Sequence, residues 1–417
     1  MNVVFVSNYF PPEVNAPATR IYEHARQWSK ESGNIEVITS VPNYPEGILH
    51  TGHQNQFSQE TVEDILVTRV PMYIAENKGF LKRTLSYISF GLTAVLYCGR
   101  LHKSPDIVVA TSPQLFGAIG GYVVSRLKKI PFVLEIRDLW PESIAAVGAV
   151  KYPWVIEIFE KVARYLYKQA TRIIVVTDSF KQDLIEKGVD PEKITVIKNG
   201  ADLEFFSQPL DPQQLETLRE QHQLKDKFVV AYIGTIGLAH RADILLEAAQ
   251  QCTNPNIVFV VIGAGAERER LEQKQAQLKL PNFRLIDKQP KALIPYFLEI
   301  TDACVVHLKD TPLFQKVIPS KMFESMVMRK PVILGVRGES CNILKEAEAG
   351  IPIEPENVNA LVDATMTLYN NKSLYTHMSN NGYNHVCQNY DRKKTAKRYW
   401  QFLESIVQQE ASDAKNH

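Results

Sequence analysis

A regular alternation of short Val- and Ile-rich runs with longer amphipathic stretches constrains the fold of this chain most. The apolar runs lack strict polar–apolar alternation, which is typical of parallel strands buried on both faces. Amphipathic stretches such as 18–28 and 152–169 predict helices between them, so the pattern indicates βαβ units. In the first half we expect strands at Val3–Val6, Ile35–Thr39, Ile107–Ala110, Phe132–Ile136, Ile173–Thr177 and Thr195–Ile197.

The same alternation starts again after a polar segment at 211–227. The simple interpretation is two doubly wound α/β domains joined near residues 200–225. Ligands of open α/β sheets bind beyond the carboxyl ends of the strands, which predicts a site there, in a cleft between the domains. In the second half we expect strands at Phe228–Ile233, Ile257–Ile262, Phe283–Ile286, Ala303–His307 and Val332–Leu334.

Charge and cysteine content exclude several classes of protein. The 417 residues carry a net charge of +1, which gives no general drive toward nucleic acid. The five Cys form no CxxC pair, which argues against a disulfide framework or a Cys-rich zinc site and fits a reducing cytosol. Met1 runs almost directly into the first expected strand, so no signal peptide is expected.

One apolar segment, Ser86–Gly99, has basic neighbours on both sides. Its length of about 14 residues is too short to span a bilayer. Two interpretations stay open: a buried helix, or a helix that lies on a membrane surface across Phe80–Lys103. The basic residues that would favour the second are Lys82, Arg83, Arg100, His102 and Lys103.

Polar residues follow two strands of the first half. After the first strand, Asn15–Thr19 present the start of a helix, whose free N–H groups can bind anions, although an ordinary connection explains them equally well. After Phe132–Ile136, a basic group, two carboxylates and an indole come together: Arg137, Asp138, Trp140 and Glu142. An Asp there could orient or deprotonate a hydroxyl and a Trp could contact a sugar, whereas the alternative is a surface ion pair beside a helix cap.

Glycine-rich turns follow two strands of the second half, at Gly234–Gly237 and Gly263–Gly265. Such turns let a diphosphate approach the backbone, but Arg268 stands where a dinucleotide fingerprint needs its third glycine. His240 and Arg241 come next and could bring a cation to a phosphate.

The most specific segment is Val317–Ser325, where Pro319 precedes a predicted helix start. Ser320 and Lys321 would bring a hydroxyl and an ammonium to the free N–H groups there, which suits a diphosphate leaving group. Glu324 lies on the same helical face and could hold two ribose hydroxyls. A solvated Lys–Glu pair is the alternative.

Six segments together carry a resemblance to a known family: Ser7–Arg20, Glu135–Ser143, Val196–Asp202, Gly234–Asp243, Val261–Glu267 and Ile318–Pro331. They resemble GT-B glycosyltransferases of family 4 (group 1). The similarity covers essentially the whole chain and is greatest to bacterial enzymes that build surface polysaccharides on polyprenyl diphosphate, including the N-acetyl-L-fucosamine transferase of O-antigen synthesis.

The resemblance implies two Rossmann-like domains that face a cleft. Residues 1–204 would bind the acceptor and residues 205–391 a nucleotide-sugar donor, usually UDP-linked, with a helix at about 392–410 packed back on the first domain. Transfer would retain the anomeric configuration. The implied donor-binding residues are Glu324, Lys321, Ser320, Gly234, Gly237, Arg241 and Gly263; the acceptor-binding residues are Asn15, Arg20, Trp140 and Glu142; and the catalytic residues are Asp138 and Arg137.

Several positions depart from the family's pattern. Lys316 stands where the first of two paired glutamates is usual, and Arg137 replaces the usual His before Asp138. Thr235 replaces an Arg whose phosphate contact we assign to Arg241 and Lys321 instead. The usual glycine pair of the first loop is Asn15-Ala16.

These features predict a glycosyltransferase of surface polysaccharide synthesis with a lipid-linked glycan acceptor. The chain has no Asp-x-Asp motif, so we expect neither a metal nor another cofactor. We expect a cytoplasmic protein, attached peripherally to the inner face of the membrane. A nucleotide-sugar 2-epimerase of the same fold and a non-enzymatic nucleotide-binding protein stay open as alternatives.

Overall fold

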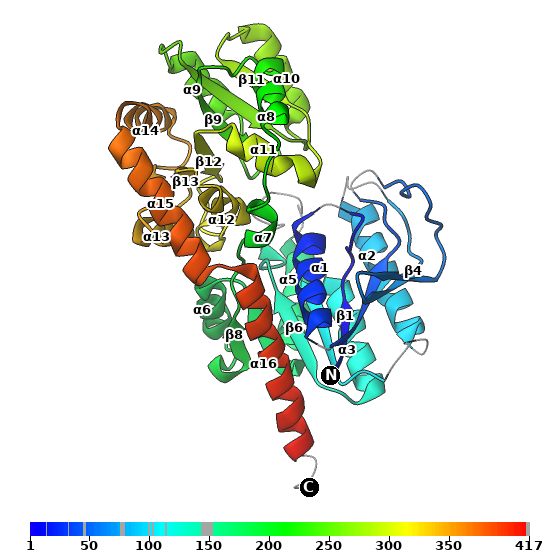
Figure 1. Cartoon of the computed structure of the whole chain (residues 1–417). Helices are drawn as coiled ribbons and strands as arrows, with labels where there is room; N and C mark the ends of the chain where they lie inside the picture. The colour runs from blue at the N-terminus through cyan, green and yellow to red at the C-terminus, as the bar shows by residue number, and fades with distance from the viewer. Residues whose placement is uncertain are drawn as a thin grey trace. The chain divides into compact units, whose positions relative to one another are not determined.

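The chain folds into two compact units, which the computed structural model describes over residues 1–13, 15–31, 33–44, 47–75, 80–98, 101, 104–112, 115–142 and 153–413. Unit 1 comprises Met1–Lys198 and Arg392–His417, and unit 2 comprises Asn199–Asp391 (Figure 1). The boundary that the sequence predicted at 204/205 lies six residues beyond the division between Lys198 and Asn199. Arg100, His102, Lys103 and Ser143, which the sequence singled out, lie outside the described residues.

Unit 1 is built on a sheet of eight described strands in the order β3-β4-β2-β1-β5-β6-β7-β8. All neighbours are parallel except β3 and β4, which form an antiparallel pair at one edge. The central strands are mostly apolar because helices cover both faces. The strands are β1 (Asn2–Val6), β2 (Asn34–Ser40), β3 (Ser58–Val62), β4 (Ile65–Val70), β5 (Ile107–Ser112), β6 (Phe132–Ile136), β7 (Arg172–Val175) and β8 (Ile194–Val196).

Helices α1 and α16 pack side by side on one face of this sheet (Figure 1), where Trp28 and Tyr399 join a core with Phe5. On the other face, Gly121 of α3 allows close contact with Ala110 of β5, since a Cβ there would lie 2.4 Å from the Ala110 side chain. The helices of unit 1 are α1 (Ala16–Lys30), α2 (Phe80–Leu96), α3 (Leu115–Lys128), α5 (Pro153–Gln169), α6 (Asp178–Glu186), η2 (Pro191–Lys193) and α16 (Arg392–Asp413).

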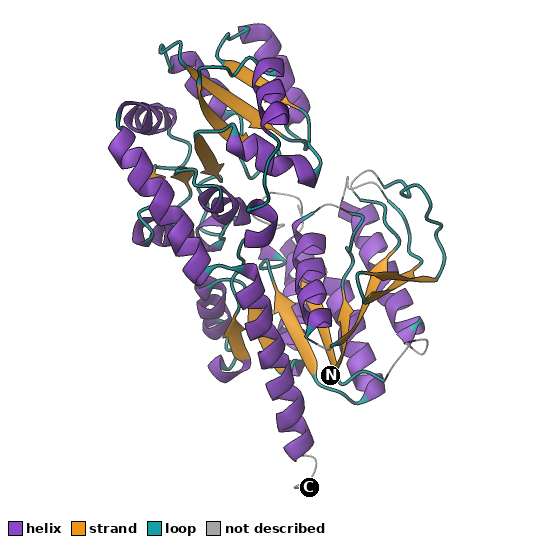
Figure 2. Ribbon diagram, viewed as in Figure 1, coloured by secondary structure: helices purple, strands orange, loops and turns teal. Residues whose placement is uncertain are grey.

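Unit 2 has a six-stranded parallel sheet in the order β11-β10-β9-β12-β13-β14, with helices packed against it (Figure 2). Its strands are β9 (Phe228–Ile233), β10 (Ile257–Ile262), β11 (Phe283–Ile286), β12 (Ala303–His307), β13 (Val332–Gly335) and β14 (Gly350–Pro352). Its helices are α7 (Leu203–Phe206), α8 (Pro212–Gln221), α9 (Ile244–Gln251), α10 (Arg268–Leu278), η3 (Lys291–Leu293), α11 (Ile294–Glu299), η4 (Phe314–Lys316), α12 (Ser320–Val327), α13 (Glu339–Glu346), α14 (Val358–Asn370) and α15 (Lys372–Asn389).

The predicted fold class, two parallel α/β domains, is confirmed, and every expected strand is present. Three strands were not predicted: β3, β4 and β14. The C-terminal helix, α16, belongs to unit 1, where Trp28 Nε1 donates to the Ala396 carbonyl at 2.9 Å. In the part of the chain that the structure describes, no helix is both long and apolar enough to cross a membrane.

Candidate functional site

The carboxyl ends of β9 and β10 bring the two glycine turns of unit 2 together. Gly234 and Gly263 have φ angles of +147° and +157°, a region that side chains other than glycine rarely adopt. A Cβ on Gly263 would lie 1.9 Å from the Gly234 carbonyl oxygen, and a Cβ on Gly265 would lie 2.3 Å from that of Ile236. These glycines therefore allow the two turns to touch each other, a requirement separate from any ligand.

Lys321, in the first turn of α12, extends its ammonium to the end of β9. Its Nζ lies 3.9 Å from the centroid of the Tyr232 ring and would lie 2.7 Å from a Cβ on Gly234. The Nζ atom is buried and, among the described residues, has no hydrogen-bond partner. Burial lowers the pKa of Lys321 to about 8, against the opposing effect of Glu324. A buried ammonium that lies against an aromatic face and has no hydrogen-bond partner in the described structure is suited to bind an anion.

Ser320 and Glu324 lie beside Lys321 on the same helix. Pro319 precedes α12 without a side-chain cap, so the free N–H groups at its start are not taken by a capping side chain. Burial raises the pKa of Glu324, while Lys291 and Lys321 lower it. The start of α12, the Lys321 ammonium and the Glu324 carboxylate thus form one polar cluster near the carboxyl end of β9.

His240 adds a second buried nitrogen near Lys321. Its Nδ1 has no hydrogen-bond partner among the described residues and lies 3.3 Å from the position of a Cβ on Gly237. Burial, then Lys321 and His307, lower its pKa to about 3, so the ring is neutral at pH 7. His307 is fixed as a neutral tautomer, because its Nε2 accepts from the Glu356 amide at 2.8 Å and its Nδ1 donates to the His240 carbonyl at 3.1 Å.

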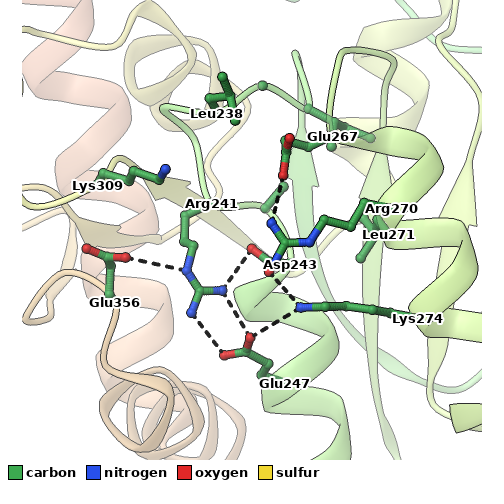
Figure 3. Close-up of a pocket in the computed structure, with 13 residues that line it drawn as sticks. Leu238, Arg241, Asp243, Glu247, Glu267, Arg270, Leu271, Lys274, Lys309 and Glu356 are labelled. Carbon is green, nitrogen blue, oxygen red and sulfur yellow. Dashed lines mark hydrogen bonds and ion pairs between the residues drawn. The ribbon is translucent and has the colours of Figure 1, made fainter. Parts of the chain in front are cut away.

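Arg241, the other cation that the sequence assigned to the phosphate, forms ion pairs with carboxylates. Its guanidinium lies 2.8 Å from Asp243, 3.0 Å from Glu247 and 3.4 Å from Glu356, at a cavity of about 350 Å³ (Figure 3). Burial alone would lower its pKa, but the bonds to Glu247 and Asp243 raise it above the usual value. Lys274 shares Asp243 at 3.1 Å, so the carboxylates are also satisfied (Figure 3).

In unit 1, Arg137 follows β6 and lies within a buried group of charges. Its Nε donates to Thr111 Oγ1 at 2.7 Å and lies 3.7 Å from Glu135 Oε2, while its Nη2 is buried without a hydrogen-bond partner in the described structure. Burial lowers its pKa to about 10. Arg20, expected to contact the acceptor, donates to Glu135 at 3.0 Å and to the Ile197 carbonyl at 3.2 Å. Asp138 lies next to Arg137 and is partly exposed.

The remaining residues predicted in unit 1 all have local contacts. Asn15 caps α1 by accepting from the Ala18 amide at 2.9 Å. The Trp140 ring packs on Phe159 with centroids 4.6 Å apart, and Glu142 pairs with Lys187. Of these residues, Trp140 and Glu142 are partly exposed, so they keep surface that a ligand can contact.

Two features of the site were absent from the residues chosen from the sequence. Tyr232 was treated only as part of a strand, although its ring carries the Lys321 ammonium. His240 was noted beside Arg241 but not selected. Among the described residues, no three His, Cys, Asp or Glu side chains lie close enough together to hold a metal ion.

Comparison with known families assigns each half of the chain separately. Residues 15–200 match the family model described as a glycosyl transferase 4-like domain. Residues 214–385 match the model described as glycosyl transferases group 1.

The individual relatives have low sequence identity to this chain, but the matches extend over most of its length. WcaI of Escherichia coli K12, a putative colanic acid biosynthesis glycosyl transferase, is 25% identical over 87% of this chain and 90% of its own length. The E. coli UDP-Gal:alpha-D-GlcNAc-diphosphoundecaprenol alpha-1,3-galactosyltransferase is 26% identical over 75% of this chain and 78% of its own. The crystal structure of Anabaena HepE with UDP and glucose matches with a TM-score of 0.73 and 16% identity, over 97% of this chain and 100% of that one.

Proposed function

The chain belongs to the group 1 glycosyltransferases of GT-B fold, and from this premise we propose that it transfers a sugar from a UDP-linked donor to a polyprenyl-diphosphate-linked glycan. The role we propose is in surface polysaccharide synthesis, such as that of O-antigen, capsule or exopolysaccharide. The relatives named for colanic acid and for a diphosphoundecaprenol acceptor support this role.

The observation that carries the donor part of the proposal is the Lys321 ammonium, buried without a hydrogen-bond partner among the described residues. A nucleoside diphosphate would supply the missing negative charge, with the N–H groups at the start of α12, Ser320 and the backbone at Gly234 and Gly237 beside it. Glu324 would accept hydrogen bonds from the two ribose hydroxyls.

For the reaction, we propose transfer with retention and without a metal ion. As the bond between the sugar C1 and the diphosphate breaks, negative charge grows on the leaving group. Lys321 and the helix start stabilise that charge without further rearrangement, which is the work a metal ion performs in other transferases. Neutral His240 can donate a hydrogen bond to the same group.

Unit 1 would bind the acceptor. Asp138 is the candidate to orient the acceptor hydroxyl, and the buried Nη2 of Arg137 has no partner among the described residues and suits a phosphate or a sugar oxygen. Trp140, Glu142 and the α1 start at Asn15 are the further acceptor contacts we propose, whereas Arg20 would act by holding Glu135.

We also propose peripheral attachment to the cytoplasmic face of the membrane through α2. Leu85, Leu92 and Leu96 are spaced to form one stripe and are 55%, 61% and 77% exposed, and Lys82 is exposed beside them. The protein should sediment with anionic vesicles and leave them in high salt. Unchanged vesicle binding after Lys82, Arg83, Arg100 and Lys103 are all replaced by Ser would contradict this attachment.

The test of the proposed function is a transfer assay with a panel of UDP-sugars and a polyprenyl-diphosphate-linked sugar. Glu324→Ala should weaken donor binding on the order of 100-fold, since it removes a carboxylate that bridges two hydroxyls. Glu269→Ala, an exposed carboxylate on α10, is the matched control. Wild-type turnover by Glu324→Ala would refute the site, and conversion of UDP-GlcNAc without any acceptor would identify an epimerase.

A further inference from the structure

A row of side chains beyond the carboxyl ends of β1 and β2 in unit 1 has no role in the mechanism above. The hydroxyl of Tyr9 lies 3.3 Å from the hydroxyl of Tyr87 in α2. Arg83, one turn earlier in α2, donates Nη2 to the Tyr87 hydroxyl at 3.4 Å. The Tyr9 ring packs edge-on against Tyr44, with centroids 5.2 Å apart. With Glu13, these four residues form what we call the tyrosine cluster.

Glu13 lies at the other end of this cluster and is 2% exposed. Its Oε1 accepts from the backbone amides of Asn43 and Tyr44, each at 3.0 Å. Tyr44 joins this end of the cluster to Tyr9, because its amide donates to Glu13 and its ring packs edge-on against the Tyr9 ring. Burial, followed by Tyr87 and then Glu13, raises the pKa of Tyr9. Burial also raises the pKa of Glu13 itself to about 7. Keeping the Glu13 carboxylate ionised in these buried surroundings therefore costs free energy of folding.

The two ends of the tyrosine cluster differ in their hydrogen-bonding groups. Nε of Arg83 is a buried donor and Oε2 of Glu13 a buried acceptor, and neither has a hydrogen-bond partner in the described structure. A buried polar group without a partner lowers the stability of the fold, and a ligand that pairs with it removes that cost. The hydroxyls of Tyr87 and Tyr9 continue the cluster from the Arg83 end. A guanidinium binds anions, and a carboxylate accepts hydrogen bonds from hydroxyls. A ligand with an anionic group and a hydroxyl would therefore pair with both Arg83 and Glu13.

Two contacts hold the loops of this cluster in place before any ligand arrives. Arg69 Nη2 donates to the Pro11 carbonyl at 2.6 Å and fixes the loop after β1. Glu13 fixes the loop after β2 through the amides of Asn43 and Tyr44. Side chains held in this way suit recognition, because little ordering remains to be done on binding.

We propose that the tyrosine cluster binds a glycosyl diphosphate, with Arg83 on a phosphate and Glu13 on a sugar hydroxyl. This inference rests on the proposed function, since it identifies the residues of unit 1 that hold the lipid-linked acceptor. Arg83 and Tyr87 lie on the side of α2 that meets Tyr9, while Leu85, Leu92 and Leu96 are exposed for the lipid surface. One helix would then contact both the bilayer and the anionic head of its substrate.

The experiment is calorimetric titration of the full-length protein with saturating UDP present, so that the Lys321 site is filled. The probes are geranyl diphosphate, the same compound carrying N-acetylglucosamine, and inorganic diphosphate. Arg83→Gln should weaken both geranyl compounds tenfold or more, and Lys128→Gln, which removes an exposed charge at the end of α3, should change them less than twofold. Glu13→Gln should weaken only the sugar-bearing compound, by about fivefold to tenfold.

Each part of the proposal has a result that overturns it. Equal effects of Arg83→Gln and Lys128→Gln would refute the phosphate contact. Equal weakening of both geranyl compounds by Glu13→Gln, or none, would refute the sugar contact, because a purely structural role does not distinguish them. Inorganic diphosphate binding as tightly as geranyl diphosphate would refute a lipid-linked ligand. Failure of the wild type to bind UDP would instead contradict the proposed function.

Discussion

Lys321 and Arg241 are both cations near the carboxyl end of β9, but their surroundings are opposite. Lys321 is buried against Tyr232 and has no hydrogen-bond partner among the described residues. Arg241 is shared by Asp243, Glu247 and Glu356. A cation already neutralised by three carboxylates must give them up to bind a phosphate, whereas an unpaired one gains its first partner. Whether a cation already has carboxylate partners therefore tells more about its role than whether it lies near the site.

The largest expected effect comes from removing Lys321. Lys321→Ala should weaken UDP binding on the order of 100-fold, because the diphosphate loses a charge-assisted contact in a site sheltered from water. Arg241→Ala should weaken it no more than about threefold. Titration calorimetry of both variants measures the difference, and a larger loss for Arg241→Ala would reverse the assignment.

A second effect should appear in the pH dependence of donor binding. The free protein holds Lys321 with a pKa of about 8, and a bound diphosphate favours the charged form, so the affinity for UDP should fall several-fold as pH rises from 8 to 9. Binding at pH 8 should also take up about half a proton. Calorimetry in buffers of different ionisation enthalpy detects this uptake; identical enthalpies in all buffers would show that Lys321 does not change its protonation.

The smallest expected effect is on stability. Arg241→Met leaves Asp243, Glu247 and Glu356 without their shared cation at a half-exposed site, which should cost about 1 kcal/mol. Urea unfolding measures this loss, and Arg270→Met, which removes a single exposed pair with Glu267, is the control. A stability equal to that of wild type would mean that the carboxylates are adequately solvated without Arg241.

The sequence predicted the strands whose burial leaves an apolar run, such as Ile257–Ile262, because both faces of a parallel strand need apolar side chains. It missed β3, whose residues Ser58–Val62 are mostly polar and lie at an exposed edge. It missed β4 because Thr68 and Arg69 interrupt the run, although both are buried through partners on β2 and β3, Glu36 and Glu60.

The segments of the candidate site were predictable, but the roles of their side chains were not. Lys321 and Arg241 look alike in the sequence, as cations near predicted helix starts, and Glu356, which helps neutralise Arg241, lies more than 100 residues away in the chain. The sequence assigned Gly263 to a phosphate contact. The structure shows another reason for a glycine there, because the Gly234 carbonyl leaves no room for a side chain. Such distinctions depend on which distant residues meet, and local patterns do not contain that information.

The position of α16 has a consequence for how the protein is made. Its residues Tyr399 and Trp400 cover Trp28 of α1, and Arg392 pairs with Glu23, yet the ribosome produces all of unit 2 before them. At 5–20 residues per second, roughly 10–40 s separate the synthesis of Lys198 from that of Arg392. During this interval the nascent first unit exposes the apolar face that α16 later seals. Unit 2 can thus finish folding before the first unit does, and the core around Trp28 closes only when α16 has been synthesised.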